Sequence, residues 1–162
     1  MLRTQDDSTD LLKLAEGAFA GERDPWANAA NAAALVFERL PDLNWAGFYF
    51  LRGGELVVGP FQGRVACARI PLGSGVCGTA AAQRATLLVP DVHAFPGHIA
   101  CDAASNSEIV VPLLASDRLV GVLDLDSPRL NRFGADDARL LEALAERLVA
   151  ACDWSLAAID GF

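Results

Sequence analysis

Three of the four cysteines lie in the middle third of the chain, where their thiols could do chemistry. Cys67 lies in GRVACARI, Cys77 in the glycine-flanked GSGVCGTA, and Cys101 in FPGHIACDAASNSE. Free cysteines often behave as buried small hydrophobic residues, but the polar neighbours of Cys101 favour a partly exposed, reactive thiol. Zinc ligation is the alternative, and the lack of a CxxC pair disfavours it, so we expect no metal site. Cys152 lies on an apolar helical face and is expected to pack in the core.

Acidic side chains form a second candidate site. Asp124 and Asp126 in GVLDLDS are two residues apart on an expected strand and therefore share a face. Glu108 begins the neighbouring strand and can join them. Like charges held close together raise the pKa of one member, which suits an acid catalyst. A cation site is a second possibility, and acids hydrated at a strand end are the plain alternative.

The register of these two strands decides whether Glu108 joins the aspartates. A regular hairpin with a two-residue loop at 116–117 would place Glu108 opposite Leu125, on the wrong face. We therefore predict a β-bulge or a three-residue loop, helped by Pro112, which cannot donate to a ladder.

Aromatic residues offer a possible wall for a small ligand. Trp45 and Tyr49 lie four residues apart on the first expected strand and share one face. Core packing is the ordinary role of such residues, and the ligand wall is the functional alternative. The two histidines, His93 and His98, lie in a loop, and their spacing from Cys101 assigns them no role.

A mostly antiparallel sheet flanked by helices from both ends of the chain must position these residues. Periodicity predicts helices over 9–20, 25–40, 75–82 and 135–156, and strands over 44–51, 55–61, 65–70, 86–89, 108–114 and 119–126. The segment 90–107 is long, polar and irregular, and ordered loops of that length are usually functional. The pattern indicates one α+β domain over residues 1–162.

Composition excludes several classes of partner. The formal net charge is −8 and no cluster of Lys and Arg occurs, so we expect no nucleic acid and no anionic membrane as a partner. Neither an apolar signal segment nor a run long enough to span a bilayer is present. We therefore expect a cytoplasmic protein, in which cysteines are more often reduced or redox-active than structural disulfides.

Beyond these residue-level arguments, whole segments resemble one family. The runs RIPLGSGVCGTAAAQ, VPDVHAFPGHIACDAASNSEIVVPL and GVLDLDSP resemble the free methionine-(R)-sulfoxide reductases, which are GAF-domain enzymes. NWAGFYF and ANAANAAALVFERL are similar to earlier segments of that family, so the resemblance covers Asn28 to Phe133. It implies a GAF-like α+β fold and a thiol-dependent oxidoreductase that reduces free L-methionine-(R)-sulfoxide to methionine.

The resemblance also implies roles for the candidate residues. Cys101 matches the nucleophile, Cys67 the resolving thiol, and Cys77 a third thiol with a less defined role. The substrate-binding residues of the family match Glu108, Asp124, Asp126, Trp45 and Tyr49. A disulfide between Cys67 and Cys101 requires the loop 90–107 to fold back over the sheet, with Cα atoms about 4.4–6.8 Å apart.

The implied reaction needs no metal or organic cofactor. Attack by Cys101 on the sulfoxide leaves a sulfenic acid, which condenses to an intramolecular disulfide that a thioredoxin-like partner reduces. The resemblance also allows a homodimer. The alternative function is a non-enzymatic GAF sensor for a nucleotide or small metabolite, because this fold hosts many ligands. A sensor needs an output domain, for which 162 residues leave no room.

Overall fold

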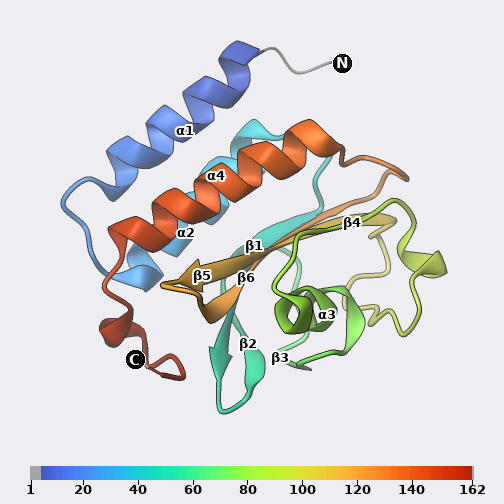
Figure 1. Ribbon diagram of the computed structural model, residues 1–162. Coiled ribbons are helices and arrows are strands. Elements are labelled where there is room, and N and C mark those ends of the chain that lie inside the picture. Colours follow the sequence, from blue (N-terminus) through green and yellow to red (C-terminus); the bar gives the residue numbers. More distant parts are fainter. Residues whose placement is uncertain (1–4, 162) are drawn as a thin grey trace.

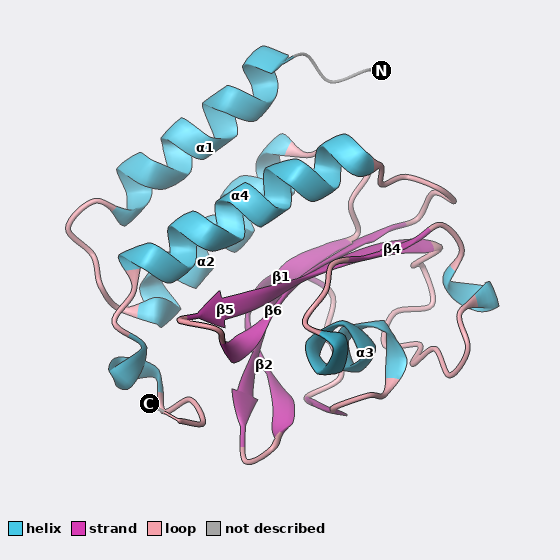
Figure 2. Ribbon diagram, viewed as in Figure 1, coloured by secondary structure: helices cyan, strands magenta, loops and turns pink. Residues whose placement is uncertain are grey.

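A six-stranded antiparallel sheet in the order β3-β2-β1-β6-β5-β4 separates two layers of the protein (Figures 1 and 2). The computed structural model describes residues 5–161. Its strands are β1 (Trp45–Arg52), β2 (Glu55–Gly63), β3 (Arg69–Pro71), β4 (Leu87–Val89), β5 (Ser107–Ala115) and β6 (Arg118–Ser127). The helices are α1 (Gln5–Phe19), α2 (Pro25–Arg39), α3 (Gly75–Gln83) and α4 (Ala135–Ala151), with short 3₁₀ turns η1 (Val92–Ala94) and η2 (Trp154–Ala157). The predicted α+β class with a mostly antiparallel sheet is confirmed.

One face of the sheet is covered by α2 and α4, and α1 packs outside them (Figure 1). Helix α2 begins where its sequence predicts, because the Asp24 carboxylate accepts hydrogen bonds from two N–H groups of the first turn and Pro25 needs no such bond. Its buried alanines allow a close approach to the sheet. Phe48 and Phe50 of β1 point into this helical core and are fully buried.

The opposite face carries α3 and the long loop between β4 and β5 (Figure 2). Side chains alternate along β1, so Trp45 and Tyr49 leave the helical core and enter a second apolar cluster. This second cluster includes Cys77 from α3 and Val110 from β5. The chemistry-bearing residues therefore gather on the face that the three long helices do not cover.

The β5–β6 hairpin contains the predicted irregularity. Ser116 and Asp117 form a two-residue turn with φ values of 49° and 63°, which suits the right-handed twist of the strands. The register then shifts by one residue beside Leu113, as a β-bulge does, and Glu108 pairs with Asp126. The bulge prediction is confirmed, and it brings the acids of both strands to one face.

Two predicted elements are shorter than expected. In place of the strand predicted over 65–70, only β3 (Arg69–Pro71) forms, because residues 64–68 make a loop in which Ala66 and Cys67 pack against the second core. Cys67 therefore lies in a loop, and its placement on a strand was wrong. The helix predicted over 135–156 ends at Ala151, where Asp153 donates its N–H to the Arg23 carbonyl and starts η2. Among residues 5–161, no helix has the length and apolar character needed to cross a membrane.

Candidate active site

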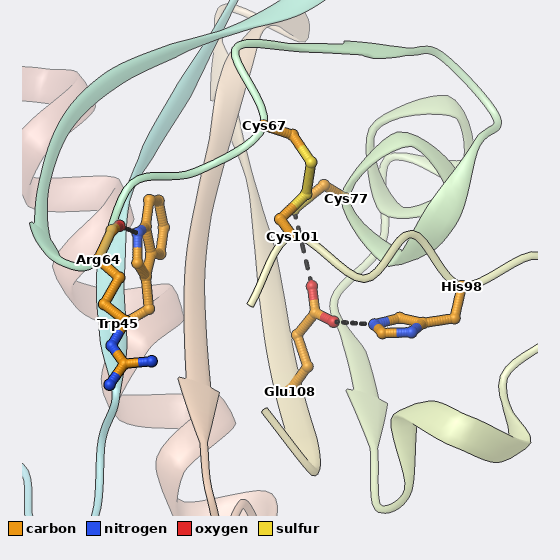
Figure 3. Close-up of a disulfide and its surroundings, with 7 residues drawn as sticks. All are labelled: Trp45, Arg64, Cys67, Cys77, His98, Cys101 and Glu108. Carbon is orange, nitrogen blue, oxygen red and sulfur yellow. Dashed lines mark hydrogen bonds and ion pairs between the residues drawn. A yellow bond between two sulfur atoms is a disulfide. The ribbon is translucent and has the colours of Figure 1, made fainter. Parts of the chain in front are cut away.

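A disulfide joins Cys67 to Cys101 on the face that carries α3 (Figure 3). Cys67 comes from the loop after β2 and Cys101 from the long loop before β5, 34 residues later. Their Cα atoms are 5.4 Å apart, within the range that a disulfide requires. The expected folding of the long loop back over the sheet is confirmed, and both cysteines are half-buried.

Polar side chains fix the segment around Cys101. The Asn44 side-chain amide donates to the Asp102 carboxylate and to the Ser105 hydroxyl, both at 3.0 Å. Asp102 also accepts the N–H of Ala104 at 2.9 Å, and this bond lowers the pKa of the Asp102 carboxyl. Cys101 is therefore held one residue from an anchored turn rather than on a freely moving loop.

A small cavity of about 40 Å³ lies beneath the disulfide. Cys101 lines it, whereas Cys67 lies outside the lining. The other lining residues come from β1, β3, α3, β5, β6 and the loops between them: Trp45, Tyr49, Val65, Ala66, Ile70, Ser74, Gly75, Val76, Cys77, His98, Ile99, Asp102, Ser105, Glu108, Asp124 and Asp126. Of the eight site residues predicted from the sequence, all but Cys67 line this cavity. Cys67 is joined by the disulfide to Cys101, which does line it.

The floor of the cavity is acidic. Glu108 and Asp124 are buried, and Asp126 is less so. Burial and the charges of the two aspartates raise the pKa of Glu108 well above its usual range. Burial raises the pKa of Asp124 to about 6. Burial and the Asp124 charge raise the pKa of Asp126, although a Ser105 hydrogen bond opposes them. The cluster therefore retains protons at pH values where isolated carboxyls are ionised.

Glu108 lies at the centre of the polar contacts (Figure 3). The Cys77 thiol donates to Glu108 Oε1 at 3.8 Å, and His98 Nε2 lies 4.0 Å from Glu108 Oε2. Burial, followed by the nearby acids, raises the pKa of Cys77 well above its usual range. Burial, followed by His93, lowers the pKa of His98. Cys77 is thus kept as a neutral thiol, and His98 is disposed to be a neutral imidazole beside a protonated acid.

Stacked aromatic rings form one wall of the cavity. The Trp45 ring lies 5.8 Å from that of Tyr49 and 5.2 Å from that of Phe61. The Trp45 indole N–H donates to the Arg64 carbonyl at 3.1 Å, so its orientation is fixed (Figure 3). Gly47 leaves the space for this stack, because a Cβ atom there would lie 2.3 Å from Phe61 Cβ. Burial and the Asp124 charge raise the pKa of Tyr49, which stays a neutral phenol.

Sequence reasoning missed several residues of the site. His98 was given no role, yet it lines the cavity beside Glu108. Asn44 went unnoticed because its partners Asp102 and Ser105 are about sixty residues away in sequence. A histidine three residues before Cys101 in a polar loop was the available signal for His98. No local pattern could have shown the role of Asn44. Cys152 is buried in the helical core, as predicted, with its sulfur 3.6 Å from the Asn28 amide.

Comparisons with known proteins agree with this geometry. The GAF domain family matches residues 27–153. A free methionine-R-sulfoxide reductase of Escherichia coli is 51% identical over 148 residues, which cover 90% of each chain. Its counterpart from Saccharomyces cerevisiae is 42% identical, over 93% of this chain and 88% of the relative.

Solved structures extend the likeness to three dimensions. The free methionine-R-sulfoxide reductase of Neisseria meningitidis, solved in complex with its substrate, superposes with a TM-score of 0.87 at 44% identity. The match covers 93% of this chain and 92% of that one. The resemblance found in the sequence is confirmed. The chain belongs to the GAF-domain family of free methionine-R-sulfoxide reductases.

Proposed function

We propose that this protein reduces free L-methionine-(R)-sulfoxide to methionine. The observation that carries the proposal is the Cys67–Cys101 disulfide at the mouth of an acid-floored, aromatic-walled cavity. Its family membership supports the same activity, since the relatives of E. coli and S. cerevisiae are named for it. The disulfide corresponds to the oxidised form of the enzyme at the end of one turnover.

Cys101 is the proposed nucleophile because it lines the cavity and Cys67 does not. The thiolate attacks the sulfoxide sulfur, and the oxygen is transferred to Cys101 while the substrate sulfur is reduced to a thioether. Methionine leaves, and Cys101 is oxidised to a sulfenic acid. The Cys67 thiol then attacks this sulfenic acid, a water molecule leaves, and the disulfide forms.

Glu108 is the proposed proton donor to the sulfoxide oxygen. Its pKa is raised well above the usual range by burial and by the neighbouring aspartates, which favours the protonated form that a proton donor needs. The pKa of Asp124, about 6, leaves this carboxyl mostly ionised at neutral pH. We assign Asp124 and Asp126 to the substrate ammonium and Glu108 to the oxygen. Cys77 and His98 act as positioning residues for Glu108.

The apolar part of the substrate needs a wall that does not compete for hydrogen bonds. The Trp45 face and the Tyr49 ring supply it, since both are buried and stacked. A free amino acid has an ammonium group for the acids to bind, whereas a residue inside a peptide has none. The enclosed site therefore favours free methionine sulfoxide over peptide-bound methionine sulfoxide.

The oxidised cavity is closed to substrate. A volume of about 40 Å³ holds roughly three water molecules. This is too little space for methionine sulfoxide, which has more heavy atoms than three water molecules. Cleavage of the disulfide frees the loop 90–107 from residues 64–68, and we propose that the loop then opens. Substrate should bind the reduced protein and not the oxidised one, which isothermal titration with both forms measures.

Recycling requires a dithiol reductant, and a thioredoxin-like protein is the proposed one. Val65 is 86% exposed and lies two residues from Cys67, so it offers an apolar contact beside the disulfide. A cytoplasmic setting would supply such reductants. The homodimer that the family resemblance allows and the single domain over residues 1–162 remain predictions, which sedimentation and limited proteolysis can test.

Methionine formation from an equimolar mixture of the (R) and (S) epimers of L-methionine sulfoxide, with a dithiol reductant, tests the proposed function. We expect half of the substrate, the (R) form, to be consumed, and a peptide containing methionine sulfoxide to react poorly. Equal rates on free and peptide-bound forms would contradict the enclosed site. No turnover together with tight nucleotide binding would instead favour the sensor function.

A further inference from the structure

Three buried side chains on the cavity floor bring their polar atoms close together. One ligand atom each from Cys77, Glu108 and Asp124 lies within 4.8 Å of the other two. The Cys77 sulfur is 3.8 Å from Glu108 Oε1, and all three residues are between 4% and 6% exposed. A thiol and two carboxylates at such distances can converge on one ion without a backbone movement.

The backbone holds these side chains in place from three different elements. Glu108 pairs with Asp126, and Val110 with Asp124, so Glu108 and Asp124 lie on alternate rows of the β5–β6 ladder and on the same face. Cys77 sits in the first turn of α3, which packs tightly on β3, since a Cβ atom on Gly78 would lie 2.3 Å from the Pro71 carbonyl oxygen. The backbone of these elements therefore fixes the three groups close together.

A second observation indicates that the cluster lacks a partner. Asp124 Oδ1 is buried and has no hydrogen-bond partner among the described residues, although Asp124 lines the cavity. An unpartnered buried carboxylate oxygen is costly. No lysine or arginine occurs among the described residues of the lining, and the histidine there, His98, lies beside Glu108 Oε2. The substrate ammonium is the partner proposed above, and in the absence of substrate the orphaned oxygen is open to a metal cation.

The donor set selects the kind of cation. Mg²⁺ and Ca²⁺ prefer oxygen ligands alone, whereas a thiolate with carboxylates suits Zn²⁺ and its analogue Co²⁺. We propose that Cys77, Glu108 and Asp124 form a binding site for Zn²⁺, with the fourth position open to water in the cavity. The ion displaces the protons of the Cys77 thiol and the Glu108 carboxyl, and both protons pass to solvent, without any change in oxidation state.

Bound Zn²⁺ would make the protein sensitive to the metal. The ion occupies the two carboxylates and the space that the sulfoxide and ammonium groups need, so it excludes methionine sulfoxide. This consequence rests on the proposed function, whereas binding of the metal does not. Inhibition should be competitive with substrate and reversed by a chelator.

The oxidised protein gives a clean test, because the disulfide removes Cys67 and Cys101 as metal ligands. Co²⁺ added to metal-free oxidised protein should produce a thiolate-to-cobalt absorption band that Zn²⁺ displaces. The free thiols are then Cys77 and Cys152. Cys77→Ser should abolish the band, and Cys152→Ser is the matched control that should keep it. Asp124→Asn should weaken Co²⁺ binding by at least about tenfold, since even outer contacts of metal sites have that effect.

Several outcomes would overturn the site. These are a Co²⁺ band that survives in Cys77→Ser, a band lost in Cys152→Ser, or no band in the unmodified protein. Circular dichroism checks that each variant is folded. If Cys77→Ser does not fold, the strength of Co²⁺ binding to Asp124→Asn tests the site instead. Methionine formation in metal-free buffer tests the proposed function separately. Sulfoxide reduction without a Cys77-dependent band would contradict only the metal site.

Discussion

Glu108 lies directly opposite Asp126 across the β5–β6 ladder, although the two-residue turn at 116–117 alone would place it opposite Leu125. The one-residue register shift beside Leu113 makes the difference. A bulge is thus the device that brings a third acid to the cavity face, because side chains on a strand alternate between faces. Gly121, which follows the bulge, is equally constrained: a Cβ atom there would lie 2.1 Å from the Tyr49 carbonyl oxygen.

Burial of Asp124 should make folding stability depend on pH. Its pKa rises from 3.8 to about 6 on folding, so the folded state holds a proton that the unfolded state releases. The contribution of this group to the free energy of unfolding is therefore full below about pH 4 and is lost as pH rises through about 6. The loss attributable to this group is about 3 kcal/mol, from two pKa units.

Urea unfolding of the oxidised protein between pH 4 and pH 7 measures this effect. Asp124→Asn should flatten the decline in unfolding free energy and leave the variant more stable than the parent at pH 7. Asp10→Asn, at an exposed position on α1, serves as the control and should follow the parent curve. Parallel curves for Asp124→Asn and the parent would show that Asp124 is not held protonated by burial.

The cysteine variants should separate the roles of the thiols. In a single turnover with reduced protein, Cys101→Ser should release no methionine, because the nucleophile is absent. Cys67→Ser should release one equivalent and accumulate a sulfenic acid on Cys101, while reductant-driven cycling stops. Cys152→Ser should cycle normally and lose some stability at most, since Cys152 packs in the helical core. Rapid-quench measurement of methionine with mass spectrometry of the protein records each result.

One outcome would contradict the proposed role of Cys101 as the nucleophile. If Cys101→Ser releases a full equivalent of methionine, the nucleophile is another thiol. Cys77 would then be the next candidate, because it lines the same cavity.

Sequence patterns predicted most of this fold because its elements are locally encoded. The Asp24-Pro25 cap, the alternation along β1 and the apolar stripe of α4 each depend on neighbouring residues. Cys67 was misplaced on a strand because Val65 and Ala66 carry a β-like pattern, whereas in the fold they line the cavity. Asn44 and His98 were missed because their partners come from other elements, and such contacts depend on tertiary packing that no local pattern records.

Gly47 should be intolerant of a side chain. A Cβ atom there would lie 2.3 Å from Phe61 Cβ and 2.8 Å from the Trp45 ring, so Gly47→Ala must displace the aromatic wall. We expect a loss of about 1–3 kcal/mol in unfolding free energy from overpacking, and a raised KM for methionine sulfoxide. Gly17→Ala in α1 is the control, since no heavy atom lies within 4 Å of its Cβ position. It should gain about 0.5–1 kcal/mol and keep KM unchanged. A Gly47→Ala variant with the parent's stability and KM would contradict the proposed wall.

The last prediction concerns which sulfur of the disulfide a protein reductant attacks. Cys101 lines a cavity whose floor includes Asp124, and the charge of this mostly ionised carboxylate repels an approaching thiolate. Cys67 lies outside the cavity lining, two residues from the exposed Val65. We expect the attacking thiolate to bond to Cys67 and to expel Cys101 as the thiolate needed for the next turnover.

A thioredoxin-like protein that retains only its attacking cysteine can trap this intermediate. Peptide mapping of the trapped complex by mass spectrometry should find the mixed disulfide at Cys67. Val65→Asp should slow reduction by the protein reductant and leave reduction by a small dithiol unchanged, because only the protein needs an apolar docking surface. A mixed disulfide at Cys101 would place the point of attack inside the cavity, and the loop 90–107 would then have to open before recycling rather than after it.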